Sequence, residues 1–215
     1  MKKLILMTVV FCAVLSAAHA QWTVGGRLGP MFGFHTSGAG MNSLAGTGIG
    51  ISEKSKMNFV IAAYGSYAFT SKLSLQPELN VMINQGQKLS SVFGSGDVVY
   101  TSLDIPVLVK FTIWEPAVAG KPLSLGLHAG PLLSIPLGGI KTKISGYSSE
   151  IDTDGITFGI TTGTYAAYPL GPGRIVADLR FLFDFNAVKA KSSGVSVDYF
   201  TRRGLIFTAG YEISF

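Results

Sequence analysis

The feature that most constrains this sequence is alternation of apolar and polar side chains, repeated in segment after segment. In residues 73–85, for example, Leu75, Leu79 and Val81 share one face, and most positions between them are polar. A period of two places successive residues on opposite faces of a β-strand. Eight segments show this pattern, at residues 22–34, 58–69, 73–85, 101–113, 122–135, 156–168, 174–185 and 203–215. No window after residue 20 is long and apolar enough to predict a membrane-spanning helix.

The lengths of the connections between these segments also alternate. The first, third, fifth and seventh connections are long, and the second, fourth and sixth are short. The long ones cover residues 36–57, 86–100, 136–155 and 186–202. Outer-membrane barrels have short periplasmic turns, long external loops, an even number of strands and both termini in the periplasm. The sequence therefore predicts an all-β fold, an eight-stranded antiparallel up-and-down transmembrane β-barrel.

Composition indicates which solvent surrounds this barrel. Hydrophobic residues make up 47% of the chain and charged residues only 13%, whereas a soluble domain carries about 25% charged residues. A soluble β-sandwich or lipocalin-like barrel would also alternate, but it would place polar side chains outside. We therefore expect outer-membrane lipid to cover the wall. The basic residues are scattered, with no run longer than Arg202-Arg203, so no nucleic-acid partner is expected.

The first 20 residues are typical of a secretory signal peptide. A basic start at Lys2 and Lys3 precedes a short apolar run and a small-residue cleavage site that ends at Ala20. Cleavage between Ala20 and Gln21 leaves residues 21–215 as the barrel domain, without the single cysteine, Cys12. The predicted location is the outer membrane of a diderm bacterium.

Aromatic residues lie near the ends of the predicted strands, where rings prefer the level of the lipid headgroups. The expected aromatic girdle consists of Trp22, Phe69, Trp114, Phe185 and Phe215. The closing residues 211–215, YEISF, resemble the C-terminal signal of outer-membrane barrels, whose last aromatic residue is read by the insertion machinery. Through Phe215, that machinery is an expected partner.

The inward faces carry charged side chains that a narrow barrel must pair. Eight strands enclose a lumen just wide enough for side chains to fill it, and an unpaired buried charge is costly. Strand positions predict that Arg27 approaches Glu212. Lys110 is expected near Gln76 and Glu78, and Asp178 opposite Glu212, a repulsive pair unless an arginine lies between them. The predicted ionic cluster, in the periplasmic half of the lumen, consists of Arg27, Glu78, Lys110, Asp178, Arg180 and Glu212.

Four segments resemble the PorT-like outer-membrane β-barrel family. They are LSLQPELNVMINQGQK at 73–88, SLDIPVLVKF at 102–111, LHAGPLLS at 127–134 and RRGLIFTAGYEISF at 202–215. The resemblance covers about residues 22–215 and implies a small, porin-like, eight-stranded barrel. It implies no single activity, because one fold hosts many functions. PorT itself is linked to assembly of a secretion system and to gliding, and that role is not carried over.

Recognised catalytic and metal motifs do not occur in this sequence. It contains no HExxH, no phosphate-binding GxxxxGK and no cysteine pair, so no catalytic residue, metal or cofactor is expected. The first functional expectation is a non-enzymatic outer-membrane protein that acts in envelope structure or surface interaction through its long loops. The alternatives are a narrow porin-like channel for ions or small solutes, and a lipid-modifying enzyme. Such an enzyme uses an outward histidine near the outer rim, and His35 lies near that rim but has inward parity.

Overall fold

A computed structural model describes residues 21–34, 36–37, 54–91, 94–144, 147–192 and 195–215. Within these residues no helix is long and apolar enough to cross a bilayer. The strands, in chain order, are β1 (Gln21–Gly33), β2 (Thr36–Ser37), β3 (Lys54–Ala68), β4 (Leu73–Ser91), β5 (Gly94–Trp114), β6 (Ala117–Val118), β7 (Lys121–Pro122), β8 (Ser124–Pro136), β9 (Ile140–Ile144), β10 (Tyr147–Asp154), β11 (Thr157–Leu170), β12 (Gly173–Asp184), β13 (Val188–Ser192), β14 (Val195–Thr201) and β15 (Arg203–Ser214).

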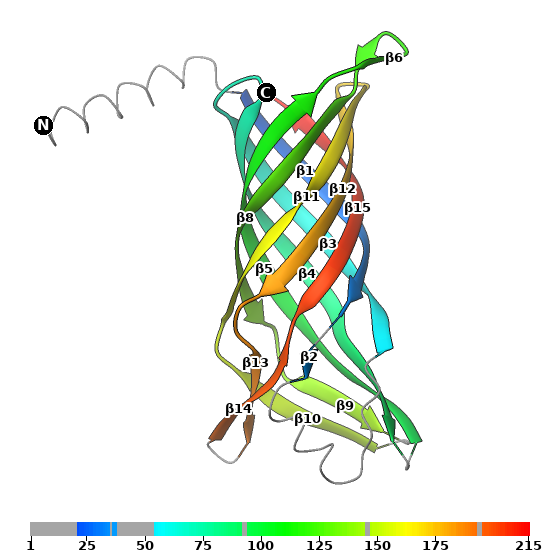
Figure 1. Cartoon of the computed structure of the whole chain (residues 1–215), viewed down its shortest axis with the longest axis vertical. Coiled ribbons are helices and arrows are strands. Elements are labelled where there is room, and N and C mark those ends of the chain that lie inside the picture. Colours follow the sequence, from blue (N-terminus) through cyan, green and yellow to red (C-terminus); the bar gives the residue numbers. More distant parts are fainter. Residues whose placement is uncertain (1–20, 35, 38–53, 92–93, 145–146, 193–194) are drawn as a thin grey trace, which may run out of the picture.

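Eight of these strands close into an antiparallel barrel (Figure 1), which confirms the predicted fold. Around the wall the order is β1, β3, β4, β5, β8, β11, β12 and β15, and β15 pairs with β1 to complete the circle. Each barrel strand overlaps one of the eight alternating segments. The period-two pattern therefore located every barrel strand.

The two ends of the barrel differ in construction. Gln21 and Phe215 lie at one end, which we call the terminal end, where the Phe215 amide donates a 2.8 Å hydrogen bond to the Trp22 carbonyl. The connections β3–β4 and β11–β12 at this end are tight, and a two-stranded hairpin, β6–β7, lies between β5 and β8. We call the opposite end the distal end.

The distal end carries a second layer of paired strands (Figure 1). Strands β4 and β5 continue past the barrel as one long hairpin, β9 pairs with β5, β10 with β9, β13 with β10, β14 with β13, and β2 with β14. We call these five strands and the outer parts of β4 and β5 the distal cap. The prediction that 86–100, 136–155 and 186–202 are loops was therefore wrong over much of their length, because alternation continues there and neighbouring strands supply ladder partners. Most of the predicted loop 36–57 lies outside the described residues.

The distal cap has a hydrophobic core of its own. Val98 and Tyr100 of β5 pack with Ile140 of β9 and with Val188 and Ala190 of β13, and all five are buried. Hairpins that share a core cannot move independently of one another. The described part of the distal end is therefore a folded surface and not a set of separate loops.

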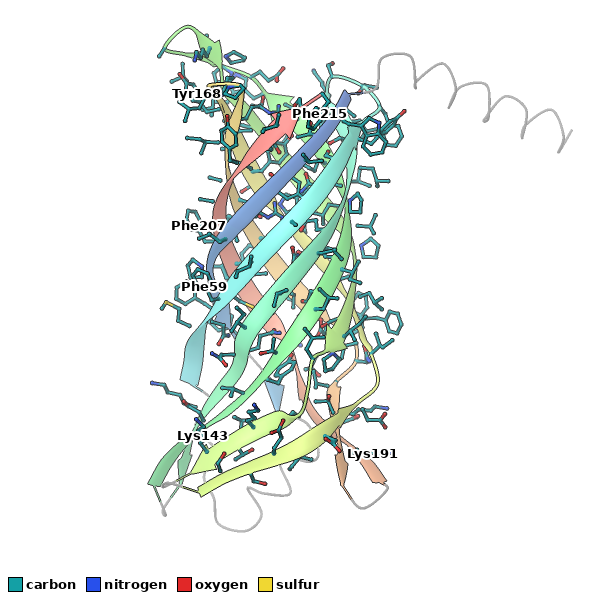
Figure 2. The ribbon with its side chains drawn as sticks, turned by 180° about the vertical axis from the view of Figure 1, so that it is seen from behind. Phe59, Lys143, Tyr168, Lys191, Phe207 and Phe215 are labelled. Carbon is teal, nitrogen blue, oxygen red and sulfur yellow. The ribbon has the colours of Figure 1, made fainter. Side chains whose placement is uncertain are left out.

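Apolar side chains cover the outside of the barrel, and polar ones fill the inside. Strand β12 shows the contrast: Ile175, Leu179 and Phe181 are exposed, whereas Asp178 and Arg180 are buried. Figure 2 shows Phe59 and Phe207 pointing outward from the middle of the wall. This inside-out arrangement is the reverse of that in a soluble barrel and matches a wall surrounded by hydrocarbon.

Candidate functional site: the filled lumen

The lumen is filled by side chains arranged in three layers. Strand β12 crosses all three, because its inward residues alternate along the barrel axis from Asp178 and Arg180, through Leu182, to Asp184. We call the layers the inner ionic cluster, the apolar layer and the distal ionic cluster. The inner cluster is the one nearer the terminal end.

Two arginines and two carboxylates form the centre of the inner ionic cluster. Arg180 lies 2.9 Å from Glu78 and 2.7 Å from Asp178 through two different nitrogens. Arg27 pairs with Glu78 and lies 3.2 Å from the same Asp178. Each arginine therefore bridges the two acids, and each acid has two cationic partners. Such a closed arrangement compensates the cost of burying four charges.

Neutral side chains satisfy the remaining oxygen atoms of this cluster. The Gln76 amide nitrogen donates to Glu78 at 2.6 Å, and the Asn80 amide nitrogen donates to its other oxygen at 3.1 Å. His128 Nε2 lies 3.0 Å from Asp178 Oδ2. The cluster is therefore held from four strands at once, β1, β4, β8 and β12, which fixes their relative register.

Glu212 and Lys110 occupy the terminal side of the inner cluster. Glu212 lies 2.6 Å from an Arg174 nitrogen and accepts a 3.0 Å hydrogen bond from Tyr64 Oη. The Lys110 ammonium donates to Gln76 Oε1 at 2.9 Å and lies 4.3 Å from the centroid of the Tyr165 ring.

Two of the predicted contacts were wrong. Arg27 does not pair with Glu212; it pairs with acids on β4 and β12, because its long side chain reaches across the lumen. Asp178 does not face Glu212, since the register sets Asp178 against Thr208 and Arg174 against Glu212. Glu212 lies four positions along β15 from Thr208, the actual partner of Asp178. Counting residues from the strand ends does not detect an offset of this size. Lys110 contacts Gln76 but makes no direct ion pair with Glu78 among the described residues.

The apolar layer closes the lumen beyond the inner cluster. Six side chains from six strands form a single buried group, and each is 3% exposed or less. They are Met31, Val60, Met82, Leu132, Leu182 and Ile206. Since none of them contacts solvent appreciably, the described side chains leave no water-filled path through this layer.

The distal ionic cluster is centred on Arg202, which sequence reasoning missed. Its guanidinium is fully buried and lies 3.1 Å from Asp104 and 2.5 Å from Asp184. It also donates a 3.0 Å hydrogen bond to Gln85 Oε1. A signal was present: the inward parity of residues 203–215, extended back by one position, places Arg202 on the same face as Thr208 and Glu212.

The predicted aromatic residues lie on the outer surface near strand ends. Trp22, Phe69, Trp114 and Phe215 are exposed at the terminal end, and Phe185 is exposed where β12 ends. The rings of Trp22 and Phe69 both contact Tyr67 edge-on, at centroid distances of 4.9 and 5.0 Å.

Three expectations fall partly or wholly outside the described residues. Gln21 begins β1, but Ala20 on the other side of the predicted cleavage site lies outside them, as do Cys12 and His35. Within the described part of the chain, no group of three or more potential metal-ligating residues occurs.

Neither a scan against protein-family models nor a search of curated proteins found a match. The structural neighbours are small eight-stranded outer-membrane β-barrels. Neisserial surface protein A is 14% identical, with a TM-score of 0.47 over 90% of this chain and 97% of that one. Ail of Yersinia pestis is 12% identical, with a TM-score of 0.46 over 89% and 99%.

A further neighbour is the outer membrane protein AlkL, determined in lipid bilayers. It is 15% identical, with a TM-score of 0.46 over 91% of this chain and 90% of that one. At these identities the likeness concerns the fold and says nothing about a ligand or an activity.

Proposed function

We propose that this protein is a non-enzymatic outer-membrane β-barrel that contributes to envelope structure or surface interaction through its distal cap. The observation that carries the proposal is the contrast between the lumen and the distal cap. Buried side chains fill the middle of the lumen, while the strands beyond it form an ordered surface. Because the long connections fold into a sheet at the distal end, that sheet is the surface that the protein presents outside the cell.

The outer wall supports the membrane location. Large apolar side chains such as Leu28, Ile61, Leu79 and Phe207 are about half exposed in the absence of lipid. Exposed apolar surface on this scale is rare in soluble monomers and marks a membrane or a protein interface. Because these side chains face outward from neighbouring strands, hydrocarbon is the medium that satisfies them.

The terminal end is then the periplasmic end, and residues 1–20 are a signal peptide removed before assembly. Short turns and both barrel termini lie at this end, as in other outer-membrane barrels. The exposed Phe215 ring at the last position is available to the insertion machinery.

The cap presents a charged face. The register sets Lys141 opposite Glu150 and Asp152 opposite Lys191, and all four side chains are exposed. Figure 2 shows Lys143 and Lys191 at the end away from Phe215. A ladder of exposed charges of both signs keeps the sheet soluble and offers polar contacts to a partner.

Surface labelling of intact cells tests the location and the orientation together. A membrane-impermeant amine reagent is expected to modify Lys141, Lys143, Lys189 and Lys191, but not Lys72 at the terminal end, until the cells are permeabilised. Peptide mass spectrometry reads the sites. Labelling of Lys72 in intact cells, or no labelling of the cap lysines, would contradict the proposal.

The channel alternative is tested by conductance of the protein in planar bilayers. We expect no discrete conductance steps, because the apolar layer excludes water from the mid-lumen. Regular steps would replace the proposal with a porin-like channel. The lipid-modifying alternative has no support among the described residues, and mass spectrometry of membrane lipids after overexpression tests it.

The PorT-like relationship is likewise a proposal. Its support is the amino-acid sequence of four segments that lie in β4, β5, β8 and β15 of the barrel. A search started from close homologues of this chain tests it, since true members should align across all four segments without gaps in the strands. Even then, only the barrel is transferred.

A further inference from the structure

We propose that the terminal end of the lumen contains a binding site for a small oxyanion, a carboxylate or phosphate group, with Lys110 as its anchor. This site is independent of the cap and of the surface role. A cavity, a buried cation without an ion-pair partner among the described residues, and a lining of hydroxyl groups support this site.

The cavity is the open mouth of the barrel at the terminal end, next to the inner ionic cluster. Its volume is about 350 Å³, room for an anion and several waters, and it is lined by residues of every barrel strand from β1 to β15. Lys110, Arg174 and Lys72 supply positive charge to its wall, and Glu115 and Glu212 supply negative charge. The cavity therefore has one excess positive charge.

The buried charges identify which cation lacks a partner. In the inner ionic cluster, the carboxylates of Glu78 and Asp178 are shared by Arg27 and Arg180, and Glu212 is taken by Arg174. Lys110 is 7% exposed, and among the described residues it makes no ion pair. Its ammonium contacts an amide oxygen and a ring face, and no described carboxylate lies within ion-pair distance of it. A buried unpaired cation is costly, and a bound anion removes that cost.

The acidic groups of the cavity do not occupy this position. Glu212 is bound by Tyr64 of β3 and Arg174 of β12. Glu115 is exposed near the rim, where it accepts a 3.0 Å hydrogen bond from Ser124. Neither carboxylate is within ion-pair distance of Lys110.

Hydroxyl groups near Lys110 fit an acceptor-rich ligand. Ser74 lies opposite Lys110 in the register of β4 and β5, and Thr112 is the next inward residue along β5. Thr112 shares a 2.7 Å hydrogen bond with Tyr165 Oη, so these hydroxyls are already oriented into the cavity. Hydroxyl donors and one ammonium suit a carboxylate or phosphate oxygen better than they suit a cation.

Titration with inorganic phosphate tests the site. The refolded protein is placed in dodecyl maltoside micelles, which contain no phosphate, and amide NMR shifts of Ser74, Thr112 and Ser124 are followed at constant ionic strength. We expect saturable shifts with sodium phosphate and none with sodium chloride. Lys110→Gln should weaken binding about tenfold or more, equivalent to about 1.4 kcal/mol. Lys121→Gln, on the exposed β6–β7 hairpin and outside the lining of the cavity, should bind as the wild type does.

Lys110→Arg keeps the test decisive if Lys110→Gln fails to fold, since it preserves the charge and should retain saturable binding. Repeating the titration with short-chain phosphatidylglycerol distinguishes a lipid headgroup from a free anion, and saturable binding of either supports the site. Shifts that never saturate, that chloride reproduces, or that persist with unchanged affinity in Lys110→Gln overturn it.

Discussion

Arg202 connects the cap to the barrel through a single buried side chain. It precedes β15 directly, follows β14, and neutralises two carboxylates that come from β5 and β12. Removing it would leave both acids buried without a cation. Loss of one partner of a buried ionic group is far more costly than loss of an exposed one.

We therefore predict that Arg202→Met destabilises the folded protein by about 3–5 kcal/mol. Urea unfolding in micelles, followed by Trp fluorescence, measures the change. Arg203→Met is the matched control, because Arg203 is exposed and adjacent in sequence. Equal effects of the two substitutions would show that the distal ionic cluster does not hold the barrel together.

Sequence reasoning reached the inner cluster more completely than the distal one for a physical reason. Inward parity identifies charged residues inside a regular strand, such as Asp178 and Arg180, but it does not say how far each side chain reaches across the lumen. Arginine partners on non-adjacent strands, as for Arg27 and Glu78, are set by barrel closure. Arg202 was missed because it lies just before the segment whose alternation was recognised.

At the scale of strands, bulges limit what alternation can predict. Asn84 has a positive φ of 55°, and the β4–β5 register shifts between Met82 and Gln85. A bulge inserts a residue and changes which side chains face inward beyond it. Asn84 has the same parity as the buried Glu78 and Asn80 but is exposed, and Gln85 is buried in its place. The simple period-two pattern holds on β4 only up to this point.

Close approach of neighbouring strands requires glycine at particular positions. A Cβ added to Gly130 of β8 would lie 1.9 Å from the Val107 carbonyl oxygen, a backbone atom that cannot move away cheaply. A Cβ added to Gly65 of β3 would meet nothing within 4 Å.

We predict that Gly130→Ala destabilises the barrel by about 1–3 kcal/mol, the usual cost of overpacking. Gly65→Ala should leave stability unchanged or raise it slightly, because alanine lowers the entropy of the unfolded chain. Urea midpoints of the two variants, compared with the wild type, provide the measurement. A neutral Gly130→Ala would mean that β5 and β8 separate more easily than their register indicates.

The cross-strand charges of the cap give a second prediction at this scale. Asp152→Lys places two lysines opposite each other on β10 and β13, and like charges directly opposite are unfavourable by about 0.2–1 kcal/mol. Amide hydrogen exchange in β13 should become faster, while exchange in the barrel strands stays unchanged. The double variant Asp152→Lys/Lys191→Asp should restore protection, and failure to do so would show that this pair does not couple the two strands.

At the scale of the whole molecule, the outer surface decides the medium in which the protein folds. Leu28 lies in the middle of β1, points outward and is 56% exposed without lipid. We predict that Leu28→Arg destabilises the protein in liposomes by about 2–4 kcal/mol, the cost of an arginine near the bilayer midplane.

Ser149→Arg, on the exposed face of the cap, serves as its control and should have no effect. The folded fraction, read from the heat-dependent shift in gel mobility, compares the variants. If Leu28→Arg folds as well as the wild type in liposomes, the outer wall at this position does not contact hydrocarbon.

The barrel itself was predictable because closure and alternation are properties of whole segments, and errors of one or two residues do not alter them. The distal cap was not, since pairing such as β10 with β13 joins hairpins that are distant in sequence. No local pattern specifies which of several free strand edges will meet.

The shared ladder of the cap also restricts how the exposed end of this protein can diverge. Hairpins that do not pair with one another tolerate insertions one at a time, but here β9, β10, β13, β14 and β2 are neighbouring strands of one sheet. A change in the length of one strand removes hydrogen-bond partners from the next. Descendants of this chain can therefore exchange outward side chains readily, while the lengths of the five strands have to be inherited together.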